Sequence, residues 1–545
     1  MSERKRRIEI YDTTLRDGTQ GEGFNLSLQD KVLIAQKLDE LGVDYIEGGF
    51  PGSNEKDRAF FKEVRALRLR RAKVCAFGMT RRRGMRAEDD PNMKALVDAE
   101  TPVVTFVGKT SDYQARAVMN VTPEENLAMI ADSVRLMTSA GRQVVYDAEH
   151  FFDTYRANPQ YAIQTLLAAE EAGASVLCLC DTNGGSMPEL IADAVAAVKR
   201  RVSPLVGIHT HNDASLAVAN ALAAVRAGAD HAQGTINGVG ERYGNMDLLP
   251  LIANLRLKYG FDCLEADSLR HLTEVSRYVY ETANMNLVPG QPYVGSSAFA
   301  HKGGMHVQAV QKDVSTYEHV DPESVGNSRR ILISELSGVS NIATKAGRKF
   351  DLENDKVTLR NVLERVKNLE NEGYQFEAAE ASFELLLRKE IGRYRRFFEL
   401  DHYRVVILKT NATAAIAEAS VKLHVNGRTE HTVAEGDGPV NALDAALRKA
   451  LTPDFPEIEG VHLTDYKVRV INSREETAAS VRVVIECKRD RGDGSETREV
   501  FGTIGVNTNI IDASWQALVD AYEYHLIHVE ESRGVTTGPA PVAVG

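Results

Sequence analysis

The amino-terminal half of the chain repeats one pattern, a short apolar run typical of a β-strand followed by an amphipathic stretch typical of a helix. Residues 27–42 illustrate the helical part, with Ser27 placed to cap its first turn and Gly42 placed to end it. The strand-like runs occupy residues 8–15, 45–50, 73–79, 103–108, 143–149, 176–182, 205–211 and 231–238. Alternating strands and helices indicate a parallel sheet, and eight such units close a (β/α)8 barrel. We therefore expect an α/β fold with a TIM barrel over residues 1–260; a doubly wound open sheet is the alternative, but it would not need eight regular units.

The rest of the chain follows two other patterns. Residues 261–400 contain helix-like segments separated by glycine-rich stretches, which predict a helical linker subdomain over the barrel mouth. Residues 401–530 contain an internal duplication, because each half has three strand-like runs and then a helix, with Asn441 or Asn509 near the helix start. This predicts an α+β regulatory or dimerisation domain, with plain structural packing as the alternative. Residues 531–545 have the composition of a disordered tail.

Length and composition exclude several classes of protein. At 545 residues the chain is too long for one ordinary domain, and 43% hydrophobic with 26% charged residues is a globular composition. The sequence has no apolar run of membrane-spanning length and no secretion signal before the first strand-like run, so we expect a cytoplasmic protein without membrane contact. The five cysteines, including Cys178 and Cys180 in one apolar run, favour buried thiols over disulfides or a metal site. A net charge of −12 argues against a nucleic-acid partner.

Two histidines stand one residue apart in the motif GIHTHND, residues 207–213. The preceding run is apolar and rich in β-branched residues, so we expect a strand. Because successive side chains of a strand point to opposite faces, His209 and His211 share one face while Thr210 points away. Two imidazoles on one face suit a divalent cation, but a hydrogen-bonded pair of core histidines is an equally good interpretation of this motif alone.

Polar residues at the ends of the other strand-like runs favour the cation-binding interpretation. They lie at or just beyond the predicted strand ends: Asp17, Glu47, Thr80, Lys109, Glu149, Thr182, His209, His211 and Asn237. The carboxyl ends of barrel strands converge at one mouth, where the active sites of this fold lie. We therefore expect these side chains to gather around one site.

The loops after the first and last predicted strands supply further candidate ligands. In DTTLRDGTQGEG, residues 12–23, Asp17 offers a carboxylate, and Arg16 offers a planar guanidinium for a substrate carboxylate or a developing oxyanion; a salt-bridged turn is the alternative. The first strand of a barrel neighbours the eighth, and the glycine-rich NGVGERYGN, residues 237–245, follows the eighth strand and ends in Asn245. Asp17, Asn245 and the two histidines would form a mixed nitrogen and oxygen site for Mg²⁺, Mn²⁺ or Zn²⁺.

With these motifs on one predicted barrel, the chain resembles a known family. DTTLRDG, HTHND and NGVGERYGN, in this order, are similar to motifs of the acyl-CoA-condensing synthases, which include 2-isopropylmalate, homocitrate and citramalate synthases. FAHKGGMHVQAV, TYEHVDPESVG and a duplicated region ending in NIIDASWQALVDA extend the resemblance over nearly the whole chain. Within the family, Thr19 of the first motif, HTHNDAS and YDAEHFFD are most similar to the longer bacterial citramalate synthases.

The resemblance implies a reaction and a role for several residues. The metal would chelate a 2-oxo acid, pyruvate in the citramalate type, and polarise its carbonyl. Arg16 would stabilise charge on the keto oxygen, and Thr182 would hold the substrate carboxylate. Glu149 is the first candidate for the base that removes a proton from the methyl group of acetyl-CoA. His306 and Tyr317 resemble a pair that serves the proton transfer or the hydrolytic step in this family.

The resemblance also implies regulation, and three alternatives stay open. The duplicated domain implies a homodimer and an end-product effector, which is isoleucine for a citramalate pathway. A 2-isopropylmalate synthase would use the branched 2-oxoisovalerate instead. A metal-dependent acyl-CoA lyase or aldolase would run carbon–carbon cleavage on a similar barrel, although the duplicated domain suits a committed biosynthetic step better. A non-enzymatic binding module is disfavoured by the convergent set of candidate ligands.

Overall fold

The computed structural model forms two compact units. It describes residues 6–265, 267–333, 341–343, 349–350, 352, 355–410, 415–471, 479–490 and 498–533. The first unit comprises the chain up to Phe299 together with Glu318–Arg329, and the second comprises Ala300–Tyr317 and the chain from Arg330 onward. The predicted tail lies outside the described residues apart from Glu531, Ser532 and Arg533.

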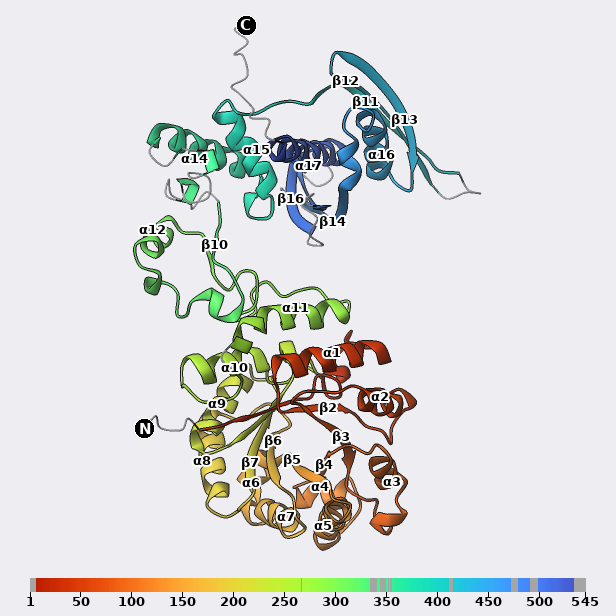
Figure 1. Ribbon diagram of the computed structural model, residues 1–545, viewed down its shortest axis with the longest axis vertical. Helices are drawn as coiled ribbons and strands as arrows, with labels where there is room; N and C mark the ends of the chain where they lie inside the picture. Colours follow the sequence, from red (N-terminus) through yellow and green to blue (C-terminus); the bar gives the residue numbers. More distant parts are fainter. Residues whose placement is uncertain are drawn as a thin grey trace. The chain divides into compact units, whose positions relative to one another are not determined.

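The first unit is a closed barrel of eight parallel strands in sequence order, surrounded by helices (Figure 1). The strands are β1 (Glu9–Asp12), β2 (Tyr45–Gly49), β3 (Lys73–Met79), β4 (Val103–Lys109), β5 (Gln143–Glu149), β6 (Val176–Asp181), β7 (Leu205–Thr210) and β8 (His231–Gly234). Pairing of β1 with both β2 and β8 closes the sheet. The eight predicted strands and the TIM barrel are confirmed, and the alternative of an open sheet is wrong.

Helices pack around the barrel, and their ends follow local rules. They are α1 (Leu28–Leu41), α2 (Glu55–Ala66), α3 (Pro91–Asp98), α4 (Asp112–Ala117), α5 (Pro123–Ser139), α6 (Phe151–Ala157), α7 (Pro159–Glu171), α8 (Pro188–Lys199), α9 (Ala217–Ala227), α10 (Leu248–Leu257) and α11 (Leu272–Thr282). Ser27 and Asp30 form a capping box at the start of α1, and Gly42 ends this helix at φ 95°. Helix α11 packs against α1, with an ion pair between Lys37 and Glu274, so the barrel unit extends past residue 260.

A layer of buried side chains fills the amino-terminal half of the barrel interior. It consists of Tyr11, Tyr45, Cys75, Val103, Val145, Val176 and Cys178, with Leu205 packed against it. These residues stand near the beginnings of their strands. The interior is therefore packed rather than open, and polar side chains gather at the carboxyl ends of the strands.

The second unit begins with short elements and helices. They are β9 (Ala300–His301), α12 (Gly304–Lys312), β10 (Arg330–Ile331), α14 (Lys356–Asn371) and α15 (Glu380–Glu390). Strands β9 and β10 pair in parallel, and α14 packs against α15. This region agrees with the predicted helical linker. Its placement over the barrel mouth stays a prediction.

The carboxy-terminal region consists of two similar halves. The first has β11 (Phe398–Leu408), β12 (Ile416–Val425), β13 (Arg428–Gly436) and α16 (Pro439–Leu451); the second has β14 (Val461–Val470), β15 (Val481–Asp490), β16 (Arg498–Asn507) and α17 (Ile510–Ser532). Each sheet is antiparallel, and Asn509 caps α17 by accepting a hydrogen bond from the amide of Ile511. The α+β domain with two repeated halves is therefore confirmed. Among the described residues, every helix is too short or too polar to cross a membrane.

Candidate active site

A cavity of about 350 Å³ opens at the carboxyl ends of the barrel strands. Its lining includes predicted site residues from the ends of five strands or the loops that follow them: Arg16, Asp17, Lys109, Glu149, Thr182, His209 and His211. Apolar side chains from the neighbouring strands, including Phe50, Phe77, Met79 and Val107, form part of the wall. Six of the nine residues with a predicted role thus line one cavity. Lys109, for which no role was predicted, lines it as well.

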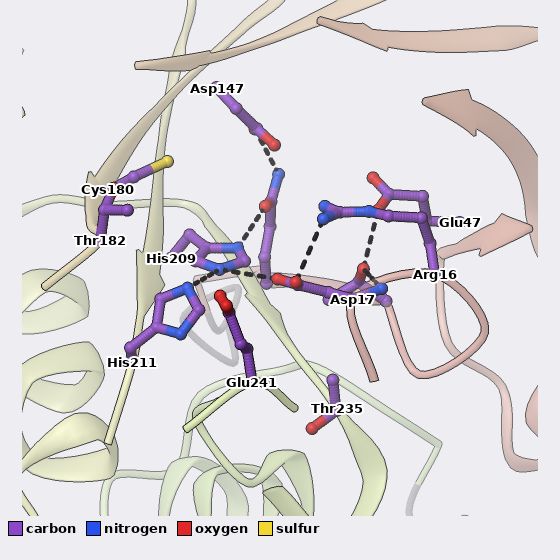
Figure 2. A network of polar contacts seen from close by, with 12 residues as sticks. Arg16, Asp17, Glu47, Asp147, Cys180, Thr182, His209, His211, Thr235 and Glu241 are labelled. Atoms are coloured by element: carbon purple, nitrogen blue, oxygen red, sulfur yellow. Dashed lines mark hydrogen bonds and ion pairs between the residues drawn. The ribbon is translucent and has the colours of Figure 1, made fainter. Parts of the chain in front are cut away.

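Asp17 and the two histidines form a compact group of ligand atoms (Figure 2). His209 Nε2 lies 3.3 Å from Asp17 Oδ2 and 3.4 Å from His211 Nε2. The three side chains are almost completely buried, and strand alternation places both imidazoles on the inner face, as predicted. Two imidazole nitrogens and a carboxylate oxygen that converge in this way are a donor set suited to a divalent cation.

The electrostatics of the group agree with cation binding. Burial lowers the pKa of His211 to about 3, helped by the neighbouring His209, so this imidazole is neutral and its lone pair is free to bind. Burial alone would raise the pKa of Asp17, but the charge of Arg16 and the hydrogen bond with His209 hold it well below its ordinary value. Burial opposes a raised pKa of His209, but the hydrogen bond and charge of Asp17 raise it, so a cation at this site would compete with a proton on that ring.

Unpartnered polar atoms beside the group provide an independent test of the fit. Both side-chain atoms of Asn245 and Nδ1 of His211 are buried without a hydrogen-bond partner among the described residues. The two residues form a bridge between the end of β7 and the loop after β8. A Cβ on Gly240 would lie 3.1 Å from Asn245 Cγ, so glycine allows the loop to fold onto this amide. Because buried polar atoms normally have partners, the residues present fit a bound cation with Asn245 close by.

Arg16 is held by three neighbours at the edge of the cavity. Its Nη1 lies 3.2 Å from Asp17 Oδ1, its Nε donates to Glu47, and its guanidinium carbon lies 3.8 Å from the centroid of the Phe77 ring. Glu47 is fully buried and also accepts a hydrogen bond from Thr13 Oγ1 at 2.7 Å. Glu47 therefore orients the guanidinium and does not itself line the cavity. A guanidinium fixed in this way is preorganised to bind an oxyanion.

Thr182 is oriented by the backbone of the neighbouring loop. Its Oγ1 accepts a hydrogen bond of 2.8 Å from the amide of His150, a residue in the left-handed conformation at φ 59°. Because that amide is the donor, the hydroxyl hydrogen of Thr182 is free to donate into the cavity. Thr182 can therefore bind a carboxylate oxygen.

His306 and Tyr317 lie outside the barrel unit. They belong to the second unit, where their rings stack with centroids 4.2 Å apart. The structure thus joins the two residues to each other, as expected for a pair. Their role at the barrel site stays a prediction.

Cys180 lines the cavity, and Cys178 belongs to the buried layer of the barrel interior. All five cysteines of the chain are buried free thiols. Burial raises the pKa of the Cys178 thiol well above its ordinary value. Although a hydrogen bond with Cys178 lowers the pKa of Cys180, burial raises it to about 11. The thiols therefore stay protonated, which agrees with the predicted packing role.

Sequence reasoning missed several residues that support the site. Gln233 of β8 accepts a hydrogen bond from His209 Nδ1 through its Oε1, and its Nε2 donates to Asp147 of β5 at 2.9 Å. Glu241 and Arg242, from the glycine-rich loop, also line the cavity. Arg242 belongs to the glycine-rich motif of residues 237–245, and Asp147 stands two residues before Glu149 on the same strand face. No pattern in the sequence connects Gln233 to Asp147, because their strands are far apart along the chain.

Comparisons with known proteins agree with this architecture. The HMGL-like family model matches residues 7–279, the homocitrate synthase post-HMGL domain-like model matches residues 293–374, and the LeuA allosteric (dimerisation) domain model matches residues 377–526. These matches define the class of the chain, an HMGL-like barrel followed by a post-HMGL domain and a LeuA domain.

Full-length relatives narrow the class further. The chain is 50% identical to an (R)-citramalate synthase of Geobacter sulfurreducens and 48% identical to one of Aquifex aeolicus, over 97% and 96% of this chain and 99% of each relative. It is 31% identical to a 2-isopropylmalate synthase of Methanocaldococcus jannaschii, over 94% of each chain. The chain belongs to the (R)-citramalate synthase family of acyltransferases. The family resemblance and the type that its motifs favoured are both confirmed.

Proposed function

We propose that the chain condenses acetyl-CoA with pyruvate and water to give (R)-citramalate and CoA, as a step in isoleucine biosynthesis. The proposal rests on one observation, that the predicted metal ligands, base and carboxylate-binding residue line the same cavity. They are Asp17, His209, His211, Glu149 and Thr182. The chain is also 50% identical, over 531 aligned residues, to a relative that is an (R)-citramalate synthase.

The site residues divide the binding of pyruvate between them. Asp17, His209 and His211, with Asn245 beside them, would hold a divalent cation, which would supply Lewis-acid polarisation of the keto group. Thr182 donates its hydroxyl hydrogen to the carboxylate of pyruvate. Arg16 stabilises the negative charge that develops on the keto oxygen.

Glu149 is the proposed base for the carbon–carbon bond. Its carboxylate takes a proton from the methyl group of acetyl-CoA, and the resulting enolate carbon attacks the keto carbon of pyruvate. The keto oxygen becomes the hydroxyl of the product after protonation. Water then adds to the thioester carbonyl, and CoA leaves as the thiol while the new carboxylate forms. His306 and Tyr317 are proposed to serve the proton transfer or this hydrolysis.

The preference for pyruvate over larger 2-oxo acids is supported by the relatives, which are (R)-citramalate synthases. Phe50, Phe77, Met79 and Val107 occupy the apolar side of the cavity. A methylene group in an apolar pocket changes binding by only about 1–3 kcal/mol, so slow turnover of larger acids is expected. The direct test incubates purified chain with acetyl-CoA and a panel of 2-oxo acids while the released thiol is followed. A kcat/KM that favours 2-oxoisovalerate over pyruvate would replace this proposal with isopropylmalate synthesis.

The carboxy-terminal domain is proposed to regulate this activity. It matches an allosteric and dimerisation domain, and it consists of two similar halves. We propose that the chain forms a homodimer and that isoleucine, the end product of the pathway, binds to residues 401–530 and inhibits. Five buried free thiols agree with the reducing environment of the cytoplasm, which is the proposed location.

A further inference from the structure

A chain of hydrogen bonds leads from His209 into the barrel interior, away from the other ligand atoms (Figure 2). His209 Nδ1 lies 2.9 Å from Gln233 Oε1, and Gln233 Nε2 lies 2.9 Å from Asp147 Oδ1. Asp147, Gln233 and His209 are 3%, 1% and 5% exposed, so bulk water does not compete for these hydrogen bonds. The three residues belong to three different strands, β5, β8 and β7.

The hydrogen bonds of this chain can point in only one direction when Asp147 is ionised. A carboxylate has no hydrogen to donate, so Gln233 must present its Nε2 group to Asp147. The amide oxygen of Gln233 then faces the imidazole. An oxygen can only accept, so Nδ1 of His209 must carry the ring hydrogen. The lone pair is left on Nε2, the atom that faces Asp17 and His211.

The surroundings of Asp147 allow the ionised state. Burial and the charge of Glu47 raise its pKa to about 6, while the hydrogen bond from Gln233 and the charges of His209 and Arg16 lower it. Cys178 and Cys180 also lie against this carboxylate, as protonated thiols. Above about pH 7 Asp147 is therefore an acceptor only.

We infer that Asp147 and Gln233 are positioning residues, which fix the tautomer of the neutral His209 imidazole so that its Nε2 presents the lone pair to a cation. This inference rests on the proposed function only in taking Asp17, His209 and His211 as the cation site. Partners that orient a ligand histidine typically change metal affinity by about 10- to 100-fold.

Exchange of the carboxylate for an amide tests the direction of the chain. In Asp147→Asn the new side chain can donate as well as accept, so Gln233 is free to turn over and present its nitrogen to His209. We expect Co²⁺ affinity, measured by competition with a chromophoric chelator at about pH 8, to fall by about 10- to 100-fold. In the double variant Asp147→Asn with Gln233→Glu, the carboxylate of residue 233 accepts from both neighbours. This variant should recover Co²⁺ affinity to within about threefold of the native chain and restore the native Co²⁺ absorption spectrum.

The barrel offers a matched control. Asp247 Oδ2 accepts a hydrogen bond of 2.9 Å from Gln291 Nε2, the same contact as between Asp147 and Gln233. Gln291 Nε2 also donates to Asn237, and Gln291 Oε1 accepts from the hydroxyl of Ser276 instead of an imidazole. Asp247→Asn should therefore leave Co²⁺ affinity within about twofold of the native value. If Asp147 had only a structural role, Asp247→Asn would lower Co²⁺ affinity as much as Asp147→Asn does. The added Gln233→Glu exchange would then not restore that affinity.

A second measurement uses the native chain and does not depend on a variant that folds. In metal-free protein with ¹⁵N-labelled histidine, at a pH where the ring is neutral, the long-range ¹H–¹⁵N spectrum should show His209 with its hydrogen on Nδ1. Hydrogen on Nε2, native affinity in Asp147→Asn, or a folded double variant without recovery would each overturn the inference. A native chain that binds Co²⁺ in this way but does not condense acetyl-CoA with any 2-oxo acid would instead overturn only the proposed function.

Discussion

Lys109 Nζ lies 2.5 Å from Glu149 Oε2 at the edge of the barrel cavity. The two residues are register partners at the carboxyl ends of β4 and β5, so the backbone pairing of the strands fixes their contact. Both side chains are mostly buried, at 19% and 23% exposed. One carboxylate oxygen of Glu149 is thus engaged by the ammonium group, which orients the proposed base in the cavity.

The first prediction concerns Glu149 as the base. Glu149→Gln keeps the shape of the side chain but cannot accept a proton, so kcat should fall by about 10²- to 10⁴-fold. Pyruvate binding, measured by calorimetry on the metal-loaded enzyme, should change little. Lys109→Met should lower kcat by less, because the base is still present but less well oriented. If Glu149→Gln retains more than about a tenth of native kcat, another group removes the proton.

The second prediction concerns the hydroxyl of Thr182. Thr182→Val removes the donor that we assign to the carboxylate of pyruvate while it conserves volume. A hydrogen bond to a charged group is worth about 1.5–3 kcal/mol, so the KM for pyruvate should rise by about 10- to 100-fold. Thr182→Ser keeps the hydroxyl and serves as the control. Equal KM values in the valine and serine variants would remove Thr182 from pyruvate binding.

The third prediction concerns the metal ligands. His211→Ala removes one of three converging donors, and bound divalent metal and turnover should be lost together. His271→Ala replaces an exposed histidine whose neighbour is Glu274 and should change neither quantity. Metal content by elemental analysis and thiol release by absorbance measure the two effects. Full metal content with full activity in His211→Ala would exclude the proposed site.

The barrel and the ligand group could be predicted because both depend on short-range patterns. Strand alternation alone places His209 and His211 on one face. Apolar runs and helix caps such as Ser27 predict each strand–helix unit. The hydrogen bonds that orient His209 could not be predicted from such local patterns. Gln233 and Asp147 lie 86 positions apart and meet only because the barrel closes. The place of His306 and Tyr317 relative to the cavity depends on how two units pack, which no local pattern encodes.

The fourth prediction follows from a buried carboxyl in the second unit. Burial raises the pKa of Glu523 to about 7, although a hydrogen bond from Tyr394 opposes the shift. The folded state therefore holds this proton more tightly than the unfolded chain, and the stabilisation present below about pH 4.5 is lost as pH rises through about 7. Asp520, with a pKa raised to about 6 by burial, acts in the same direction.

The free energy of unfolding of the second unit should thus fall by up to about 3 kcal/mol between pH 5 and about 8. Glu523→Gln should weaken this dependence and stabilise the unit at the higher pH. Trp515, the single tryptophan of the chain, lies in α17 near Glu523 and reports the unfolding in urea by its fluorescence. A variant whose stability follows pH as steeply as the native chain would contradict the assignment to Glu523.

The last prediction concerns the site of regulation, and it is best tested on the whole chain. Helix α15 packs against α17, with hydrogen bonds from Ser382 Oγ to Asp520 at 2.6 Å and from Arg388 to Glu531 at 2.7 Å. A chain cut near residue 400 would expose this buried face, so loss of inhibition after truncation would be hard to separate from loss of folding.

Hydrogen exchange on the full-length enzyme avoids that ambiguity. A ligand shifts an equilibrium only by its differential affinity for the two states, so an inhibitor must protect amides where it binds. We expect isoleucine to inhibit turnover and to slow exchange within residues 401–530, whereas pyruvate slows exchange in the loops around Asp17 and Thr182. Valine at the same concentration is the matched control and should have a weaker effect on both readouts. Inhibition by isoleucine with protection confined to the barrel would place the effector in the catalytic cavity, as a competitor of pyruvate.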